Sequence, residues 1–198
     1  MNDYIYPLPH GSGLCNWPLE WYWQQLKCYD HHISNGLRAV YLQDHWSNEH
    51  KAIWNSLWQL CESILHHYDI HQTELSVNLT TFEKGTGGWW HKDISRNDTH
   101  CTVNIPIIYH GYDKIEFSSV DPNLIPTTYK DGTDPEFARL AEEKSVGVVG
   151  YIKPTLVNTR TIHRSLGHGP ERTLLRIILQ GRSYDATLAH ILQRGTKG

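Results

Sequence analysis

The spacing of apolar residues changes along the chain, and this change restricts the folds that it can adopt. Between about residues 48 and 66, apolar side chains recur every three or four positions, which is typical of an amphipathic helix. From Leu75 onward they alternate with polar side chains, which is typical of strands with one buried face. Helices followed by many short strands predict a mainly β fold with flanking helices on one side, a β-sandwich or jelly roll.

The same patterns place the individual elements. Short helices are predicted near residues 18–26 and 186–192, and another begins after Asp134, which can cap it, with Pro135 at its first position. Strands are predicted over residues 37–42, 75–80, 101–108, 115–120, 146–151, 156–158, 161–165 and 172–180.

We interpret residues 1–198 as a single domain. Residues 1–72 are expected to form an N-terminal arm with supporting helices, residues 73–182 the β core, and residues 183–198 a C-terminal tail. Residues 121–144 interrupt the rhythm of the strands. We interpret them as an insertion over the β core and as a candidate lid.

Composition excludes several classes of function. Apolar residues make up 39% of the chain and charged residues 20%, as expected for a soluble globular protein. The net charge of -3 gives no strong attraction to nucleic acid or to an anionic membrane, so we predict no membrane association and disfavour a nucleic-acid substrate. No secretory signal, membrane span or C-x-x-C pair is found, which favours a cytoplasmic protein with free thiols. The oligomeric state is left open.

His91-Lys92-Asp93, followed seventy residues later by His163, supplies the residue types that can hold one metal ion. Two His and one carboxylate on one face of a metal leave the opposite positions open, as in non-haem Fe(II) oxygenases. In a strand, His91 and Asp93 would point to one side and Lys92 to the other. His163 lies at the centre of a predicted strand that could run opposite His91.

The His-x-Asp pattern is weak by itself. The chain has 14 His, so roughly one match is expected by chance. A second match, His67-Tyr68-Asp69, lies at the end of the long predicted helix. Residues i and i+2 diverge on a helix, so we assign this second match no metal role.

Arg172 follows His163 by nine positions and begins an apolar strand in which Arg172, Leu174 and Arg176 share one face. A guanidinium that points into an apolar barrel needs a partner, and a carboxylate held by two parallel N–H bonds suits arginine. Taken alone, Arg172 would be interpreted as a surface residue. Its spacing from His163 favours a place in the site.

From Leu75 to Gln180 the chain resembles the Fe(II)- and 2-oxoglutarate-dependent dioxygenases. The family pattern is His-x-Asp or His-x-Glu, then a distant His, then Arg or Lys shortly afterwards, and every element is matched in order. The resemblance rests on two blocks of sequence, Trp89-Trp90-His91-Lys92-Asp93 with the strand at 101–107, and Thr161-Ile162-His163-Arg164-Ser165-Leu166-Gly167 leading to 172–176.

The resemblance implies a cupin-like jelly roll, the double-stranded β-helix, with Fe(II) bound by the catalytic ligands His91, Asp93 and His163. Arg172 would then pair with the far carboxylate of 2-oxoglutarate, with Arg176 as the alternative. Many members carry a Ser or Thr two residues after this arginine, where this chain has Leu174.

Two further predictions concern the walls of the pocket. Asn104 is expected to contact the co-substrate near the metal, unless it is a structural amide bonded to backbone. One of Trp89 and Trp90 is expected to wall the pocket while the other packs in the core. The glycine-rich loop at residues 85–88 is placed at the mouth.

The resemblance implies a reaction in which O2 and 2-oxoglutarate are consumed and succinate and CO2 are released. A carboxylate at Asp93 argues against the halogenating branch, so we expect hydroxylation. The leading substrate is an amino acid, a peptide or another small molecule. Two alternatives stay open, a cupin-like metalloenzyme that does not use 2-oxoglutarate and a non-catalytic ligand-binding relative.

Overall fold

The computed structural model describes residues 4–9, 17–34, 36–71, 74–93, 101–108, 114–124, 134–150, 153–167 and 169–195. The helices within these ranges are α1 (Leu19–Leu26), α2 (Asn48–His67), α3 (Pro135–Glu143) and α4 (Tyr184–Gly195), with short 3-10 turns η2 (Lys27–Tyr29) and η3 (Pro122–Leu124). The strands are β1 (Ile5–Pro7), β2 (His31–Ser34), β3 (Leu37–Val40), β4 (Leu75–Phe82), β5 (Cys101–Ile108), β6 (Lys114–Ser118), β7 (Ser145–Gly150), β8 (Thr155–Val157), β9 (Ile162–Leu166) and β10 (Arg172–Leu179). None of the described helices is long and apolar enough to cross a membrane.

Two antiparallel sheets form the body of the protein. One has the strand order β1-β8-β5-β10-β4-β3-β2, and the other has the order β7-β6-β9. From β4 onward the chain passes back and forth between the sheets, so that β5, β8 and β10 belong to the larger sheet and β6, β7 and β9 to the smaller one. This is a double-stranded β-helix, and the predicted mainly β jelly-roll fold is confirmed.

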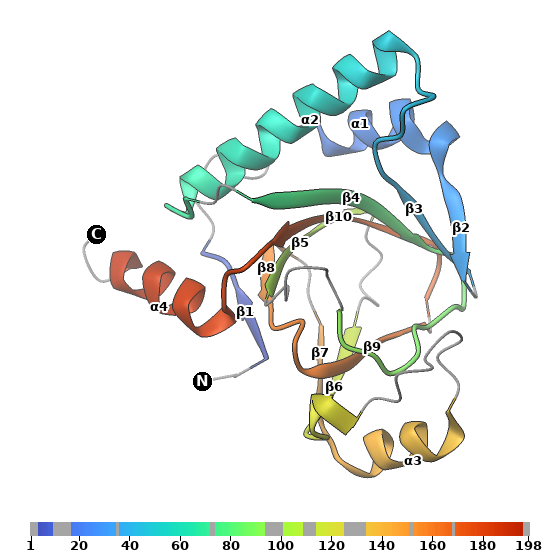
Figure 1. Ribbon diagram of the computed structural model, residues 1–198, viewed down its shortest axis with the longest axis vertical. Coiled ribbons are helices and arrows are strands. Elements are labelled where there is room, and N and C mark those ends of the chain that lie inside the picture. The colour runs from blue at the N-terminus through green and yellow to red at the C-terminus, as the bar shows by residue number, and fades with distance from the viewer. Residues whose placement is uncertain are drawn as a thin grey trace.

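The largest hydrophobic core lies between the larger sheet and the helices that cover its outer face (Figure 1). Leu57, Ile64 and Leu65 on α2 are fully buried against strand residues such as Val77 and Ile177. Helix α2 begins where expected, because the Ser47 hydroxyl accepts a hydrogen bond from the backbone of His50. The amphipathic pattern therefore decides which face of the helix packs against the sheet.

The opposite face of the larger sheet carries polar and aromatic side chains. Directly paired residues on neighbouring strands point to the same face, so the register defines rows across the sheet. One row joins Asn104 to Arg176. The next row joins Thr80 to Leu174, and a third joins Phe82 to Arg172. The predicted alternation along β5, with Asn104 on one face and Val103 on the other, agrees with this arrangement.

Flanking helices were predicted on one side of the β core, but the structure has helices on two sides. Helices α1 and α2 cover the larger sheet, whereas α3 lies beyond the smaller sheet on the opposite side of the molecule (Figure 1). Phe137 and Ala141 of α3 pack with Trp90, Val120 and Ile162. Helix α3 therefore covers the outside of the smaller sheet, and no described residue of 121–144 lines the pocket between the sheets.

The N-terminal region also contributes strands to the sheet. The segment expected to be an extended arm contains β1, which pairs with β8. Strands β2 and β3 form a hairpin that adds to β4 at the other edge. The larger sheet is therefore wider than the core that the sequence predicted for residues 73–182.

Candidate metal centre and its pocket

Backbone pairing brings the two halves of the predicted site together. The backbones of His91 and His163 exchange two hydrogen bonds, of 2.9 and 2.8 Å, in an isolated β-bridge. On one side of this bridge the amide of Gly88 donates to Ser165 at 2.8 Å, and on the other the amide of Asp93 donates to Thr159 at 3.0 Å. The segment before the metal motif thus runs antiparallel along β9, and this pairing places both imidazoles at one point.

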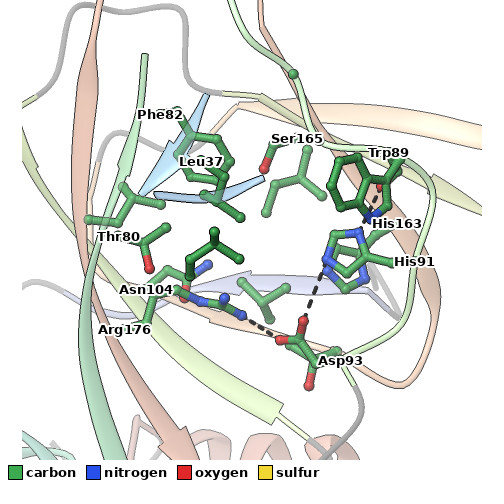
Figure 2. A pocket seen from close by; sticks show the side chains of 17 residues that line it. Leu37, Thr80, Phe82, Trp89, His91, Asp93, Asn104, His163, Ser165 and Arg176 are labelled. Carbon is green, nitrogen blue, oxygen red and sulfur yellow. Dashed lines mark hydrogen bonds and ion pairs between the residues drawn. The ribbon is translucent and has the colours of Figure 1, made fainter. Parts of the chain in front are cut away.

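The His91-Lys92-Asp93 motif is not a regular strand. Within this motif only His91 makes a β-bridge. The Asp93 amide bonds to Thr159, whereas a regular antiparallel ladder would bond it to the residue two positions before His163. The chain bends after His91, because that hydrogen bond draws it toward the loop before β9. Asp93 nevertheless points toward the imidazoles (Figure 2).

The side chains of His91, Asp93 and His163 form a group whose ligand atoms all lie within 4.8 Å of one another. The Nδ1 of His91 lies 2.7 Å from the carbonyl oxygen of Trp89, and the Nδ1 of His163 lies 2.8 Å from that of Thr161. A carbonyl oxygen only accepts, so each Nδ1 is the donor, and the neutral ring keeps its lone pair on Nε2. Such a bond is the usual support of a metal-binding histidine.

Electrostatics keep the side chains of His163 and Asp93 in the protonation states that bind a cation. Burial, together with the neighbouring His91 imidazole, lowers the pKa of His163 to about 4, so this ring is neutral at pH 7. Burial by itself raises the pKa of Asp93, but the Arg176 guanidinium, together with the hydrogen bond from His91 and the two neighbouring imidazoles, outweighs it and holds the pKa of that carboxyl well below its usual range. The residues therefore offer two imidazoles and one carboxylate, a donor set suited to Fe(II).

The second oxygen of Asp93 is held by Arg176. The Nη2 of Arg176 donates to Oδ2 of Asp93, while Oδ1 lies 3.5 Å from Nε2 of His91 (Figure 2). Both of these last two atoms carry lone pairs, and a cation shared between them would satisfy both. Arg176 thus fixes the orientation of the carboxylate, which leaves Oδ1 toward the imidazoles.

The three side chains open into a cavity of about 240 Å³ between the two sheets. Asn104, Thr80 and Arg176 form a polar part of its wall, and much of the remaining lining is apolar (Figure 2). Asn104 lines the cavity, and its Oδ1 accepts a hydrogen bond from Thr102 at 3.1 Å. Its predicted contact with the co-substrate stays a prediction. The apolar lining comes from Ile33, Leu37, Phe82, Ile115, Val157 and Leu174.

Arg172 is buried at the start of β10, four residues before Arg176 and on the same face of the strand. Its guanidinium lies 4.3 Å from the centre of the Phe82 ring, and Nη1 donates to the carbonyl oxygen of Leu166 at 2.7 Å. Phe82 lines the cavity, whereas Arg172 is not among the residues that do. Of the two predicted arginines, Arg176 therefore reaches the metal end and Arg172 lies beside the far end.

The two tryptophans before the metal motif divide their roles as predicted. Trp89 lines the cavity, and Trp90 is buried in the core beneath α3. The Arg164 guanidinium lies 4.5 Å from the centre of the Trp90 ring and forms ion pairs with Glu116 and Glu142, each at 2.8 Å. This network joins α3, β6 and β9 on the outer side of the smaller sheet and supports the strand that carries His163.

Gly167 allows the close approach that makes the backbone pairing possible. A Cβ atom at this position would lie 1.9 Å from the carbonyl carbon of Thr86. Gly167→Ala is therefore expected to cost about 3 kcal/mol of unfolding free energy, at the upper end for overpacking, and to weaken metal binding. Urea unfolding measures the cost, with Gly85→Asn as the control at an open position with a φ of +75°. Equal stabilities of the two variants would contradict the expectation.

Several residues of the pocket were not predicted from the sequence. Ser165 follows His163 by two positions on β9 and lines the cavity, so strand alternation would have found it. Thr80 is the direct partner of Leu174, but this pairing cannot be derived from either segment alone. Ile33 and Leu37 come from the hairpin of β2 and β3. A strand was predicted from Leu37 onward, but the dipeptide Asn35-Gly36 is the sequence signal for the turn that joins it to β2.

Solved structures share this architecture. No protein-family model and no curated protein matches the chain. A Pseudomonas putida prolyl-4-hydroxylase aligns with a TM-score of 0.51 and 11% identity over 90% of this chain and 92% of that one. A viral collagen prolyl hydroxylase from Paramecium bursaria Chlorella virus-1 aligns with a TM-score of 0.52 and 10% identity over 92% and 98%.

The epimerase SnoN from nogalamycin biosynthesis, in complex with Fe3+, alpha-ketoglutarate and nogalamycin RO, aligns with a TM-score of 0.56 and 13% identity. The alignment covers 89% of this chain and 78% of that one. Identities this low establish shared architecture and leave activity to be argued from the site. The chain therefore has the double-stranded β-helix fold of structures that include 2-oxoglutarate- and Fe(II)-dependent oxygenases.

Proposed function

We propose that this protein is an Fe(II)- and 2-oxoglutarate-dependent dioxygenase. The observation that carries the proposal is the convergence of His91, Asp93 and His163, with both imidazole Nδ1 atoms held by backbone carbonyls. Two imidazoles and one carboxylate leave other positions of the metal open for further ligands. When bound, Fe(II) supplies oxidation of a substrate by O2, coupled to decarboxylation of 2-oxoglutarate to succinate and CO2.

The residues of the chain bind and orient in this proposal. His91, Asp93 and His163 hold the metal, and Arg176 keeps Asp93 in its binding orientation. Arg172 holds the far carboxylate of 2-oxoglutarate, with Arg176 as the alternative, and Asn104 contacts the co-substrate near the metal. The apolar walls exclude water from the reacting groups.

Hydroxylation of an amino acid, a peptide or another small molecule is the proposed reaction. Two of the structures that resemble the chain are prolyl hydroxylases, which supports this class of substrate. A third is an epimerase, so the fold by itself is compatible with more than one outcome. The slightly negative net charge of -3 gives no support to a nucleic-acid substrate.

A cytoplasmic location is also proposed. Among the described cysteines, Cys28, Cys61 and Cys101 are free thiols. Reducing compartments keep thiols in this form, which supports the proposal.

An anaerobic titration tests the function. Fe(II) is added to the protein without O2, followed by 2-oxoglutarate, and a weak visible charge-transfer band is expected. Admission of O2 should then release succinate. Metal binding without the band or succinate would favour the cupin-like metalloenzyme that does not use 2-oxoglutarate. Failure to bind Fe(II) at all would favour a non-catalytic relative.

A further inference from the structure

A hairpin from the N-terminal part of the chain closes the pocket at the end away from the metal ligands. Ile33 of β2 and Leu37 of β3 both line the cavity. Leu37 pairs with Phe82 on β4, and Phe82 pairs with Arg172 on β10, so that the three lie in one row across the larger sheet. Figure 2 shows Leu37 and Phe82 across the pocket from the two imidazoles.

The spacing of residues along β10 gives the distance between the metal end of the pocket and the end closed by the hairpin. Arg176 holds Asp93 at the metal end, and Arg172 lies four residues earlier on the same face of the strand. Four strand residues span about 13 Å, and side chains from both ends shorten the gap that a ligand can fill. Leu174 lies between them and lines the cavity. An acid with one end at the metal and the other near Arg172 would therefore reach the row that contains Leu37.

The hairpin is fixed in place by contacts on both sides of this row. The carbonyl oxygen of Gly36 accepts the amide of Glu83 at 2.8 Å, directly after Phe82. Gly36 has a φ of +76°, and a Cβ atom there would lie 2.3 Å from the Thr86 side chain, so the turn packs closely on the loop before the metal motif. The hairpin therefore closes this end of the pocket as a part of the fold that is held by backbone contacts.

Arg38 adds an ion-pair network to the same end. It lies 3.1 Å from Asp30, 3.4 Å from Glu83 and 3.5 Å from Glu171. Glu83 follows Phe82 and Glu171 precedes Arg172, so the network connects the hairpin to the ends of β4 and β10. A single surface ion pair contributes little to stability, whereas this network joins three strands.

Ile33 reaches the pocket because of an irregularity in the hairpin. The register between β2 and β3 shifts between His32 and Ser34, which makes Ile33 the extra residue of a β-bulge. Bulges redirect a side chain and are frequent beside functional sites. Ile33 is 46% exposed although it is a large aliphatic residue, and it lines the cavity. It therefore forms the outer edge of the wall.

We propose that Leu37 and Ile33 set the length of the 2-oxo dicarboxylic acid that the pocket accepts. This inference rests on the proposed function and adds two specificity-determining residues to it. Aliphatic side chains give a carboxylate no hydrogen bond, so an acid too long for the space pushes its carboxylate away from Arg172 and into an apolar wall. One methylene more or less in a tight pocket changes selectivity about 10–200-fold.

The test compares 2-oxoglutarate with 2-oxoadipate, which is longer by one methylene. Binding of each acid is measured anaerobically by the Fe(II) charge-transfer band, and independently by calorimetry on the Mn(II)-loaded protein. Leu37→Ala and Ile33→Ala are each expected to shift the ratio of the two affinities toward 2-oxoadipate by about tenfold or more. Leu37→Met, which conserves volume, should keep the ratio of the unmodified protein.

Leu42→Ala is the matched control, because Leu42 is an exposed leucine just after β3 that lines a different cavity. It should leave the ratio unchanged. Ile33 is an exposed side chain, so its variant keeps the test valid if Leu37→Ala fails to fold. Binding of 2-oxoglutarate by the unmodified protein with unchanged ratios in both alanine variants overturns this inference alone. Absence of binding to the unmodified protein overturns the proposed function as well.

Discussion

Replacing His163 by alanine is expected to weaken Fe(II) binding by roughly several hundredfold. A structural zinc ion is bound with about 10–16 kcal/mol by four ligands, so one ligand is worth about 2.5–4 kcal/mol. His163 is buried, and its Nδ1 bond to Thr161 already fixes the ring with Nε2 toward the site. No reorganisation is therefore needed before the metal binds, and the whole contribution is lost with the side chain.

Anaerobic calorimetry with Fe(II), or with Mn(II) as a redox-stable substitute, measures this loss. The chain offers a matched control in His67→Ala, which alters the other His-x-Asp pattern at the end of α2. That variant should bind the metal as the unmodified protein does, because the His67 side chain is exposed on a helix far from the described ligand group. Equal affinities of the His163 and His67 variants would place the metal elsewhere.

Strand positions in the β core could be predicted from the sequence because burial on one face is a local property. Alternation along residues 75–80 and 101–108 predicted β4 and β5, and the cap at Asp134 predicted the start of α3. The meeting of His91 with His163 is a different kind of prediction. Spacing alone did not separate His91 from His67. The predicted helix at His67 excluded that match, and the family resemblance then supported His91 as a partner of His163.

Features that depend on distant contacts were missed or misplaced. Helix α3 was predicted correctly as a helix, but its amphipathic pattern does not say which sheet it covers, and it lies outside the smaller one. Strand β1 pairs with β8, whose residues lie some 150 positions later in the chain, so no local pattern reveals it. The bend after His91 depends likewise on Thr159. Each of these is set by tertiary contacts, which override local preference.

Alanine variants of the two arginines on β10 should separate their roles. Arg172→Ala is expected to weaken 2-oxoglutarate binding by about 3 kcal/mol, roughly a hundredfold, because a charge-assisted bidentate contact is lost and a carboxylate is left unpaired. Metal affinity without 2-oxoglutarate should stay unchanged, since Arg172 bonds to Leu166 and contacts no metal ligand among the described contacts. Arg172→Lys should recover part of the loss, as a point charge without the planar fork.

Arg176→Ala should give the opposite order of effects. Its guanidinium holds Oδ2 of Asp93, so its removal is expected to weaken metal binding by about 10–100-fold even without 2-oxoglutarate. Mn(II) calorimetry, performed with and without 2-oxoglutarate, measures both quantities for each variant. A large loss of 2-oxoglutarate affinity in Arg176→Ala with little change in Arg172→Ala would assign the far carboxylate to Arg176. The co-substrate would then lie across the polar end of the pocket beside Asn104, and the hairpin of β2 and β3 would contact another ligand.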